Sequence, residues 1–220
     1  MSATPDADAQ VARELVQGLY RQGAAASVVS VVIGAVIVGV MWARVPHSTL
    51  GVWFVLVLAN QVVRVAVMRA FDRVRSSAYD PAPWLRRYTL SMGAGSALFG
   101  SVAFVMFPAG DPLGQAFLVI MVFGIAAGAM SAHAYHRPAL VAHVLLMLVP
   151  MMLRLAFEGG FDYDALVFTM AFGLLAILAF GLRLSKVRCS ASRWRVATRH
   201  SRCRRPWRQA KTTWTRSRAR

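Results

Sequence analysis

The chain alternates long apolar runs with short polar connections. Apolar runs of about 18–20 residues, each with few charges, recur between residues 24 and 182. As helices, runs of this length match the roughly 30 Å hydrocarbon core of a bilayer. The pattern therefore predicts an all-α fold, a polytopic membrane helix bundle. Its six expected helices cover residues 24–43, 50–68, 89–107, 113–132, 139–157 and 165–182.

Charges in the connections predict the orientation of these helices. Segment 69–88 is basic, "PAGDP" carries only Asp111, "HAYHR" is basic again, and "EGGFDYD" is acidic. The positive-inside rule then places both termini and the basic connections in the cytoplasm, with Arg44 as a single exception outside. The basic residues expected beside the anionic headgroups of the inner leaflet are Arg69, Arg73, Arg75, Arg86, Arg87 and Arg137.

The chain divides into three expected segments. Residues 1–23 form a cytoplasmic segment in which "AQVARELVQGLYRQ" has the pattern of a short amphipathic helix. This helix either lies on the inner leaflet or extends into the first span. Residues 24–182 form the membrane domain, and residues 183–220 form a basic tail that is expected to be disordered.

Most of the net charge lies in that tail. It holds 14 of the 25 Lys and Arg residues and no acidic residue, whereas residues 1–182 hold 11 basic and 9 acidic residues. The net charge of +16 therefore describes the tail and not the membrane domain. A nucleic-acid arm, a membrane-surface segment and an out-of-frame stretch from about residue 186 are the alternatives for it.

The residues of the tail favour the out-of-frame interpretation. No Leu, Ile, Met or Phe follows Leu184, so a coiled-coil seam cannot form. Trp194, Trp207 and Trp214 each require the codon TGG. When a C precedes TGG, reading one base earlier gives the leucine codon CTG. Nucleic acid is accordingly not an expected partner.

Small residues at four-residue spacing predict close helix contacts. They are Gly93, Ala97 and Ser101 in the third predicted helix, with Ser96 and Gly100 on another row of that helix, and Gly124, Gly128 and Ala132 in the fourth. Such rows let two membrane helices approach closely. We expect these two helices to pack tightly against each other or a neighbour, and a homodimer could use the same faces.

Polar side chains inside the predicted helices are the candidate sensing residues. They are Asn60, Gln61, Arg64 and His143. Polar groups inside a membrane usually face the bundle interior or a water-filled cavity, which favours a ligand-sensing site. The alternative is that Arg64 extends to the headgroups while Asn60 bonds a neighbouring helix. Arg154, near an outer helix end, is expected to extend outward.

The sequence predicts no metal site, cofactor or catalytic residue. His133, His136 and His143 could share one helical stripe, as metal or haem ligands would, but Pro138 interrupts it. The chain has no phosphate-binding glycine loop and no carboxylate pair near a nucleophile. Catalysis is therefore not expected.

The order of features resembles the multi-helix membrane input region of bacterial sensor histidine kinases and diguanylate cyclases. The resemblance covers about residues 9–185. The stretches that carry it are "RELVQGLYRQ", "MWARVP", "VVRVAVMRAFDR", "WLRRY", "GIAAGAMSAHAYHRPAL" and "PMMLRLAFEGG". It implies a multi-pass sensory module in the bacterial inner membrane, which feeds a cytoplasmic helix and an output domain.

The chain departs from that pattern after its last span, where the expected signalling helix is missing. We therefore expect a sensory input module that lacks a kinase or cyclase output domain. The alternative function is a small membrane transporter or channel subunit. A transporter should show an inverted repeat, and none is evident between residues 24–107 and 113–182.

Overall fold

Every regular element in the described part of the protein is a helix. The computed structural model describes residues 5–77, 79–128, 130 and 136–187, and no strand occurs among them. Five helices in these ranges are long and apolar enough to cross a membrane, which agrees with the predicted membrane helix bundle. One shorter apolar helix of 17 residues corresponds to the fourth predicted span.

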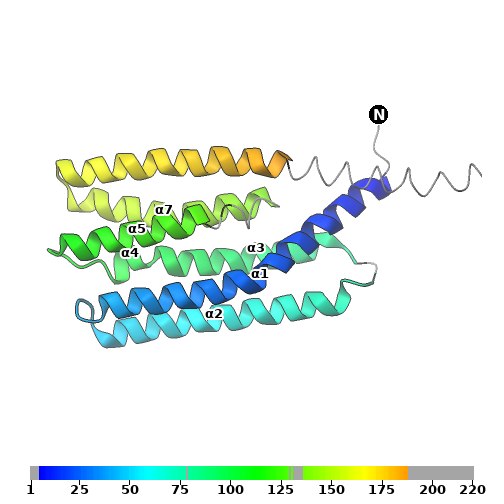
Figure 1. Ribbon diagram of the computed structural model, residues 1–220, viewed down its shortest axis with the longest axis horizontal. Helices are drawn as coiled ribbons and strands as arrows, with labels where there is room; N and C mark the ends of the chain where they lie inside the picture. Colours follow the sequence, from blue (N-terminus) through cyan, green and yellow to red (C-terminus); the bar gives the residue numbers. More distant parts are fainter. Residues whose placement is uncertain (1–4, 78, 129, 131–135, 188–220) are drawn as a thin grey trace, which may run out of the picture.

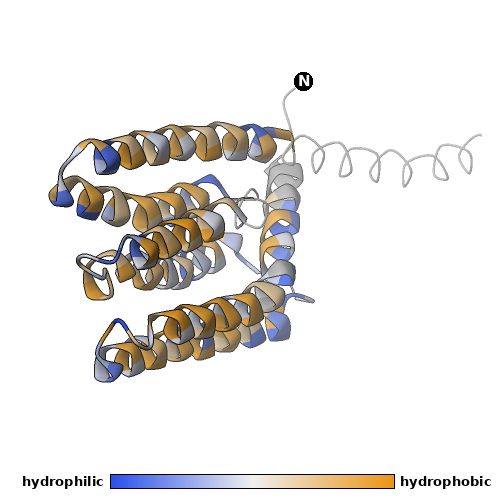
Figure 2. Cartoon of the chain, turned by 60° about the vertical axis from the view of Figure 1, so that its left-hand side comes forward, coloured by the Kyte–Doolittle hydropathy of each residue, from blue (hydrophilic) through white to orange (hydrophobic). Residues whose placement is uncertain are grey.

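The long helices run side by side along one axis (Figure 1). In chain order the elements are α1 (Pro5–Met41), α2 (His47–Val74), α3 (Pro81–Gly100), α4 (Val102–Val105), α5 (Pro112–Gly128), α7 (Arg137–Glu158) and Phe161–Val187, called here the last helix. Apolar residues cover much of their surface (Figure 2). Leu113 and Phe168 are 73% and 76% exposed. Soluble monomers rarely expose extended apolar patches, so these faces suit contact with lipid.

α1 is one continuous helix that begins well before the first predicted span. Of the two alternatives for residues 9–22, the structure therefore shows the helical extension. This half of α1 slants across one end of the bundle (Figures 1 and 2). Leu19 is fully buried, the Tyr20 ring stacks on Phe71 at 4.2 Å, and the Tyr20 hydroxyl donates to the Trp84 carbonyl oxygen at 3.0 Å. The apolar face of the extension is thus covered by α2 and α3.

α3 starts at Pro81, earlier than the predicted start at residue 89. The prediction assigned Pro81 and Pro83 to the connection, and this was wrong. Proline is compatible with the first helical turn because the N–H groups there have no intrahelical acceptor. Asp80 caps the helix by accepting a hydrogen bond from the Ala82 N–H at 3.0 Å.

α3 comes closest to α7 at Gly100. A Cβ atom on Gly100 would overlap the carbonyl oxygen of Leu146 and lie 3.3 Å from Pro150 Cγ. Pro150 has no N–H group, so the Leu146 carbonyl oxygen lacks the backbone donor that it would usually have within α7. Because Gly100 has no side chain, the backbone of α3 can lie next to this unpaired carbonyl. Neighbouring helices are one of the means by which membrane helices tolerate an internal proline.

The predicted small-residue row on α3 meets α7 only in part. A Cβ on Gly93 would lie 3.6 Å from Leu146 Cδ1, which is ordinary contact. Ala97, however, is exposed, and the Ser101 hydroxyl bonds the Leu98 carbonyl of its own helix at 2.7 Å. The buried face that meets α7 is the neighbouring one, which contains Gly100.

The predicted row on α5 makes no close helix contact in the described structure. A Cβ on either Gly124 or Gly128 would meet no atom within 4 Å. Ala132, the third member of the row, lies outside the described residues. The two glycines instead line a cavity together with residues of α1.

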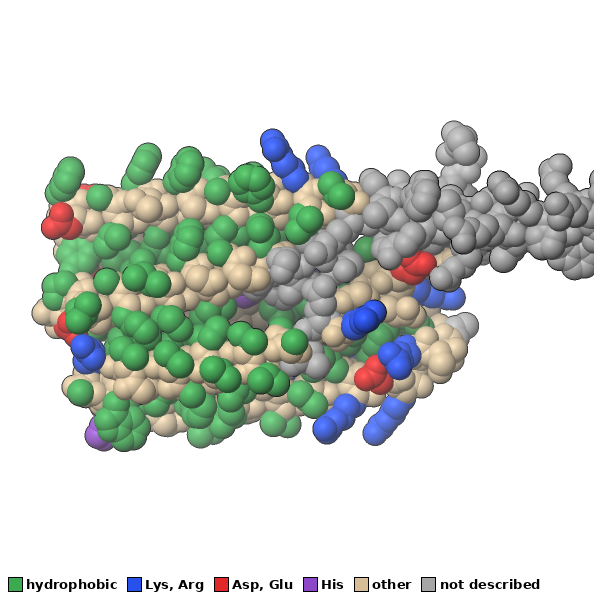
Figure 3. All heavy atoms as spheres, viewed as in Figure 1, with side chains coloured by type: hydrophobic (Ala, Val, Ile, Leu, Met, Phe, Trp, Pro, Cys, Tyr) green, Lys and Arg blue, Asp and Glu red, His purple; other side chains and the backbone are tan. Residues whose placement is uncertain are grey.

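Basic side chains outnumber acidic ones at one end of the bundle (Figure 3). One end gathers exposed basic side chains, which include all six residues predicted for the inner leaflet. At the opposite end, the two arginines that depart from the charge pattern both have acidic partners. Arg44 pairs with Asp111, and Arg154 pairs with Glu158. The exceptions are therefore neutralised locally.

Candidate site: a polar-floored cavity in the bundle

A cavity of about 680 Å³ lies between five helices, near the middle of their spans. Its lining comes mainly from α1, α3 and α5, with two residues from α2 and one from α7. This volume falls within the range of about 300–1,000 Å³ that is common for small-molecule sites. It contains three of the four polar residues that the sequence singled out, namely Gln61, Arg64 and His143.

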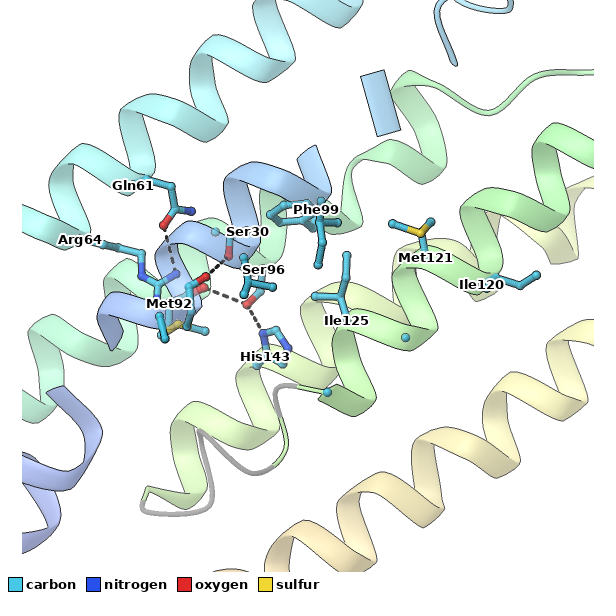
Figure 4. A pocket seen from close by; sticks show the side chains of 17 residues that line it. Ser30, Gln61, Arg64, Met92, Ser96, Phe99, Ile120, Met121, Ile125 and His143 are labelled. Atoms are coloured by element: carbon cyan, nitrogen blue, oxygen red, sulfur yellow. Dashed lines mark hydrogen bonds between the residues drawn. The ribbon is translucent and has the colours of Figure 1, made fainter. Parts of the chain in front are cut away.

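The polar floor consists of two pairs of hydrogen-bonded side chains (Figure 4). Arg64 Nη1 donates to Gln61 Oε1 at 3.3 Å, one helical turn away on α2. Ser96 on α3 shares a hydrogen bond of 2.7 Å with His143 Nδ1 on α7. The Ser96 hydroxyl also lies 2.8 Å from the Met92 carbonyl oxygen, so this serine links the imidazole to the backbone of α3.

Arg64 does not extend to the headgroups, contrary to the alternative that the sequence left open. Its side chain is only 7% exposed and bonds Gln61, which lies toward the start of α2. Side chains in a helix tilt toward the helix N-terminus. The basic end of α2 is its C-terminal end, so an arginine here is directed away from that surface and into the bundle.

No carboxylate neutralises Arg64 within the described structure. The ion pairs found there involve Arg44, Arg75 and Arg154. No Asp or Glu is among the residues that line the cavity. A buried cation without a counter-ion is expensive, so the arrangement favours an anionic group next to Arg64.

Apart from this floor and Ser30 of α1, whose hydroxyl bonds the Ala26 carbonyl oxygen of its own helix, the cavity walls are apolar. Phe99, Met121 and Ile125 project toward the space (Figure 4). Gly124 and Gly128 leave room on the α5 side because they carry no side chain. The site therefore offers a small polar region joined to a larger apolar one.

The cavity opens sideways between α1 and α5. Val29 on α1 and Ile120 on α5 both line it, yet they are 54% and 69% exposed on the outside of the bundle. Figure 3 shows a hollow near the middle of one face, with a histidine side chain visible inside it. In a bilayer, an opening at this level would face the acyl chains.

Asn60 is the predicted polar residue that stays outside the cavity lining. Its amide nitrogen packs against α3, 2.8 Å from the position of a Cβ on Gly95. This buried Nδ2 has no hydrogen-bond partner among the described residues, so it donates no bond there to a neighbouring helix. The glycine instead provides the space for the amide.

The described histidines, His136 and His143 among them, belong to no cluster of potential metal ligands. No group of three or more potential ligands occurs in the described ranges, and His133 lies outside them. His136 sits just before α7, where burial lowers the pKa of its imidazole below the ordinary value. His143 instead joins the cavity floor through Ser96.

Sequence reasoning did not assign Ser96, Gly124 and Gly128 to a ligand site. The glycines were interpreted as a helix contact, and a cavity-facing glycine carries the same local pattern as a contact-forming one. Ser96 lies one turn before Gly100 on the buried face of α3. Its burial was the available signal, but a membrane serine often bonds only its own helix, so the pairing with His143 was not predictable.

Comparison with family models, with curated proteins and with solved structures finds no match to this chain. The arrangement of the cavity must therefore supply the functional argument by itself. Its groups can bind and orient a ligand that has an anionic part and an apolar part.

Proposed function

We propose that the chain is a sensory input module of a bacterial signalling protein, which binds a ligand in the central cavity. The observation that carries this proposal is the position of α5 between the cavity and the last helix. Gly124 and Gly128 face the cavity. Phe123, on another side of α5, lies so close to the last helix that a Cβ on Gly173 would overlap its ring.

This contact supplies a mechanical route from the cavity to the cytoplasmic side. A ligand that fills the space beside Gly124 would change the position of α5. Phe123 would then shift against Gly173, and the last helix would slide or tilt with it. Sliding of packed helices by an ångström or two is a common form of conformational coupling.

We further propose six spans, with both termini in the cytoplasm of a bacterial inner membrane. With 17 residues, α5 is about 26 Å long, which is a few ångströms short of the roughly 30 Å hydrocarbon core and at the lower limit of about 17 residues for a membrane-spanning helix. The excess of basic side chains at one end of the bundle supports this orientation. The exposed arginines of the basic end would then contact anionic headgroups, at about 1 kcal/mol each. A homodimer through the exposed small-residue row at Ala97 is an additional proposal.

A cavity-filling variant tests the sensory mechanism without a known ligand. Gly124→Leu should occupy the space that a ligand would fill, since nothing lies within 4 Å of its Cβ. Nitroxide labels at Ser77→Cys and Lys186→Cys, in a chain with Cys189 and Cys203 replaced by serine, report the position of the last helix. We expect Gly124→Leu to shift the spin–spin distance distribution.

Gly51→Leu is the matched control, because Gly51 is also a helical glycine with open space around it but does not line the cavity. It should leave the distribution unchanged. If the two variants give the same distribution, the cavity is not coupled to the last helix and the sensory mechanism is wrong.

A transporter or channel subunit is the second candidate function. The observation that favours it is a polar floor built near the middle of the helices, where transporters bind their substrates. A transporter should move a ligand across sealed vesicles, whereas a sensory module should only bind it. Flux into protein-containing vesicles above that of protein-free vesicles would favour this alternative.

A further inference from the structure

We infer that the central cavity binds a single-chain amphiphile with a carboxylate headgroup, which enters from the bilayer between α1 and α5. This inference rests on the proposed function in treating the cavity as the ligand site, and it names the chemical class of the ligand. Four features of the cavity carry it: a buried cation, a wall without carboxylates, an apolar chamber and a sideways opening.

Arg64 supplies the cation for the headgroup. A guanidinium carries five N–H donors in a planar fork that matches a carboxylate. In the described structure, Gln61 Oε1 accepts a single hydrogen bond from Arg64, at 3.3 Å, and no carboxylate pairs with it. Tyr88 of α3 also interacts electrostatically with Arg64, which is only 7% exposed, but a tyrosine is neutral and a carboxylate would be the first counter-ion of this guanidinium among the described residues.

The rest of the floor is polar but carries no acidic group. Ser96 and His143 line the cavity beside Arg64 and are held to each other at 2.7 Å. The lining therefore adds polar atoms that tolerate a headgroup without competing for the guanidinium. Charge selection at this floor depends on Arg64.

The apolar chamber suits a single chain. Phe99, Met121 and Ile125 form its walls, and the glycines of α5 keep it open. A volume of about 680 Å³ is ample for one flexible chain. A lipid with two acyl chains would have to leave its second chain in the bilayer.

The opening selects an amphiphile over a water-soluble anion. Val29 and Ile120, the exposed residues at its two sides, are both apolar and belong to helices that cross the bilayer. Neither side chain offers a polar group to an ion that arrives from water. An amphiphile already dissolved in the membrane would present its chain to these residues first.

Binding of radiolabelled laurate to the purified full chain in nanodiscs tests the inference, with protein-free nanodiscs as background. We expect saturable binding that unlabelled laurate displaces, and that dodecanol and acetate do not. Arg64→Gln should weaken binding at least tenfold, and Arg64→Lys should restore part of it. Gly124→Leu should also weaken binding, whereas Gly51→Leu should not.

Any of three results overturns the inference. Dodecanol or acetate displaces radiolabelled laurate as effectively as unlabelled laurate does, or Arg64→Gln binds laurate normally. If both Arg64 variants fail to fold, normal binding to the Gly124→Leu variant overturns it instead. The spin-label distances in Gly124→Leu do not depend on laurate. A failure of laurate binding is thus distinguishable from a failure of the sensory mechanism.

Discussion

Gly100 is the position at which adding a single methyl group should lower the stability of the protein most. A Cβ there overlaps a backbone carbonyl of α7, and backbone cannot move aside as a flexible side chain can. We expect Gly100→Ala to destabilise the protein by about 1–3 kcal/mol, the usual range for overpacking. Thermal unfolding in a nonionic detergent would show this as a lower midpoint.

Gly39→Ala is the control for this prediction, since a Cβ at Gly39 meets nothing within 4 Å. Alanine is a better helix former than glycine by about 0.5–1 kcal/mol, so the control should be neutral or slightly stabilising. A Gly100→Ala protein as stable as this control would mean that α3 and α7 are not held at this distance.

Asp111 gives the end of the bundle opposite the basic end a defined pH dependence. Its Oδ1 accepts a hydrogen bond from the Gly114 N–H at 3.1 Å, and its other oxygen pairs with Arg44. The Gly114 bond, followed by that from Arg44, holds the Asp111 pKa below its ordinary value. A depressed carboxylate pKa adds stability above the unfolded value of about 3.9, and this is lost as pH falls through the folded value.

The thermal midpoint of Asp111→Asn should therefore lie below that of the natural chain by a constant amount from pH 8 to about pH 5. The difference should shrink below about pH 4, as the natural carboxylate becomes protonated. Asp164→Asn, at an exposed carboxylate of the same end, serves as the control. A difference that persists at pH 3 would exclude the carboxylate as its source.

At the scale of elements, the amino-terminal half of α1 packs against an aromatic cluster of α2 and α3. Tyr20 stacks on Phe71 and bonds the backbone at Trp84. Tyr20→Ala should lose both contacts and release this half-helix, exposing Arg13 and Arg21 to trypsin. Faster cleavage at these arginines, followed by mass spectrometry, is the expected result.

Val28→Ala is the matched change on the same helix, at a side chain that is 65% exposed and outside the cluster. It should be cleaved at the natural rate. If Tyr20→Ala resists trypsin as well as Val28→Ala does, then the segment is retained by the bilayer surface, as the rejected alternative held.

At the scale of the whole molecule, the proposed six-span topology depends on whether α5 crosses the membrane. Single cysteines at Gly110 and His136 flank α5, and a cysteine at Ser77 marks the basic end. In a chain with Cys189 and Cys203 replaced by serine, an impermeant maleimide added to intact cells should label Gly110→Cys alone. Labelling of Gly110→Cys and His136→Cys together would mean that α5 does not cross.

The sequence predicted a bundle of membrane helices, which agrees with the five long apolar helices of the structure, and a direction in the membrane, which stays a prediction. Apolar runs of bilayer length and the alternation of basic and acidic connections are local signals, and each needs only its own segment to be interpreted. It also identified Gln61, Arg64 and His143, because a polar residue inside an apolar helix is conspicuous whatever surrounds it. Helix ends were less accurate, since Asp80 and Pro81 can end a loop or begin a helix with equal ease.

Only the tertiary structure decided which residues meet. Glycines at 100 and 124 look alike in sequence, yet one receives a neighbouring backbone and the other leaves a cavity open. The sequence is compatible with an Arg64 side chain that extends to the surface. In the structure it is buried and bonds Gln61, because the direction of α2 places it inside the bundle. The physical reason is that small and polar residues limit which contacts a helix face can make, whereas the positions of the neighbouring helices determine which contacts it does make.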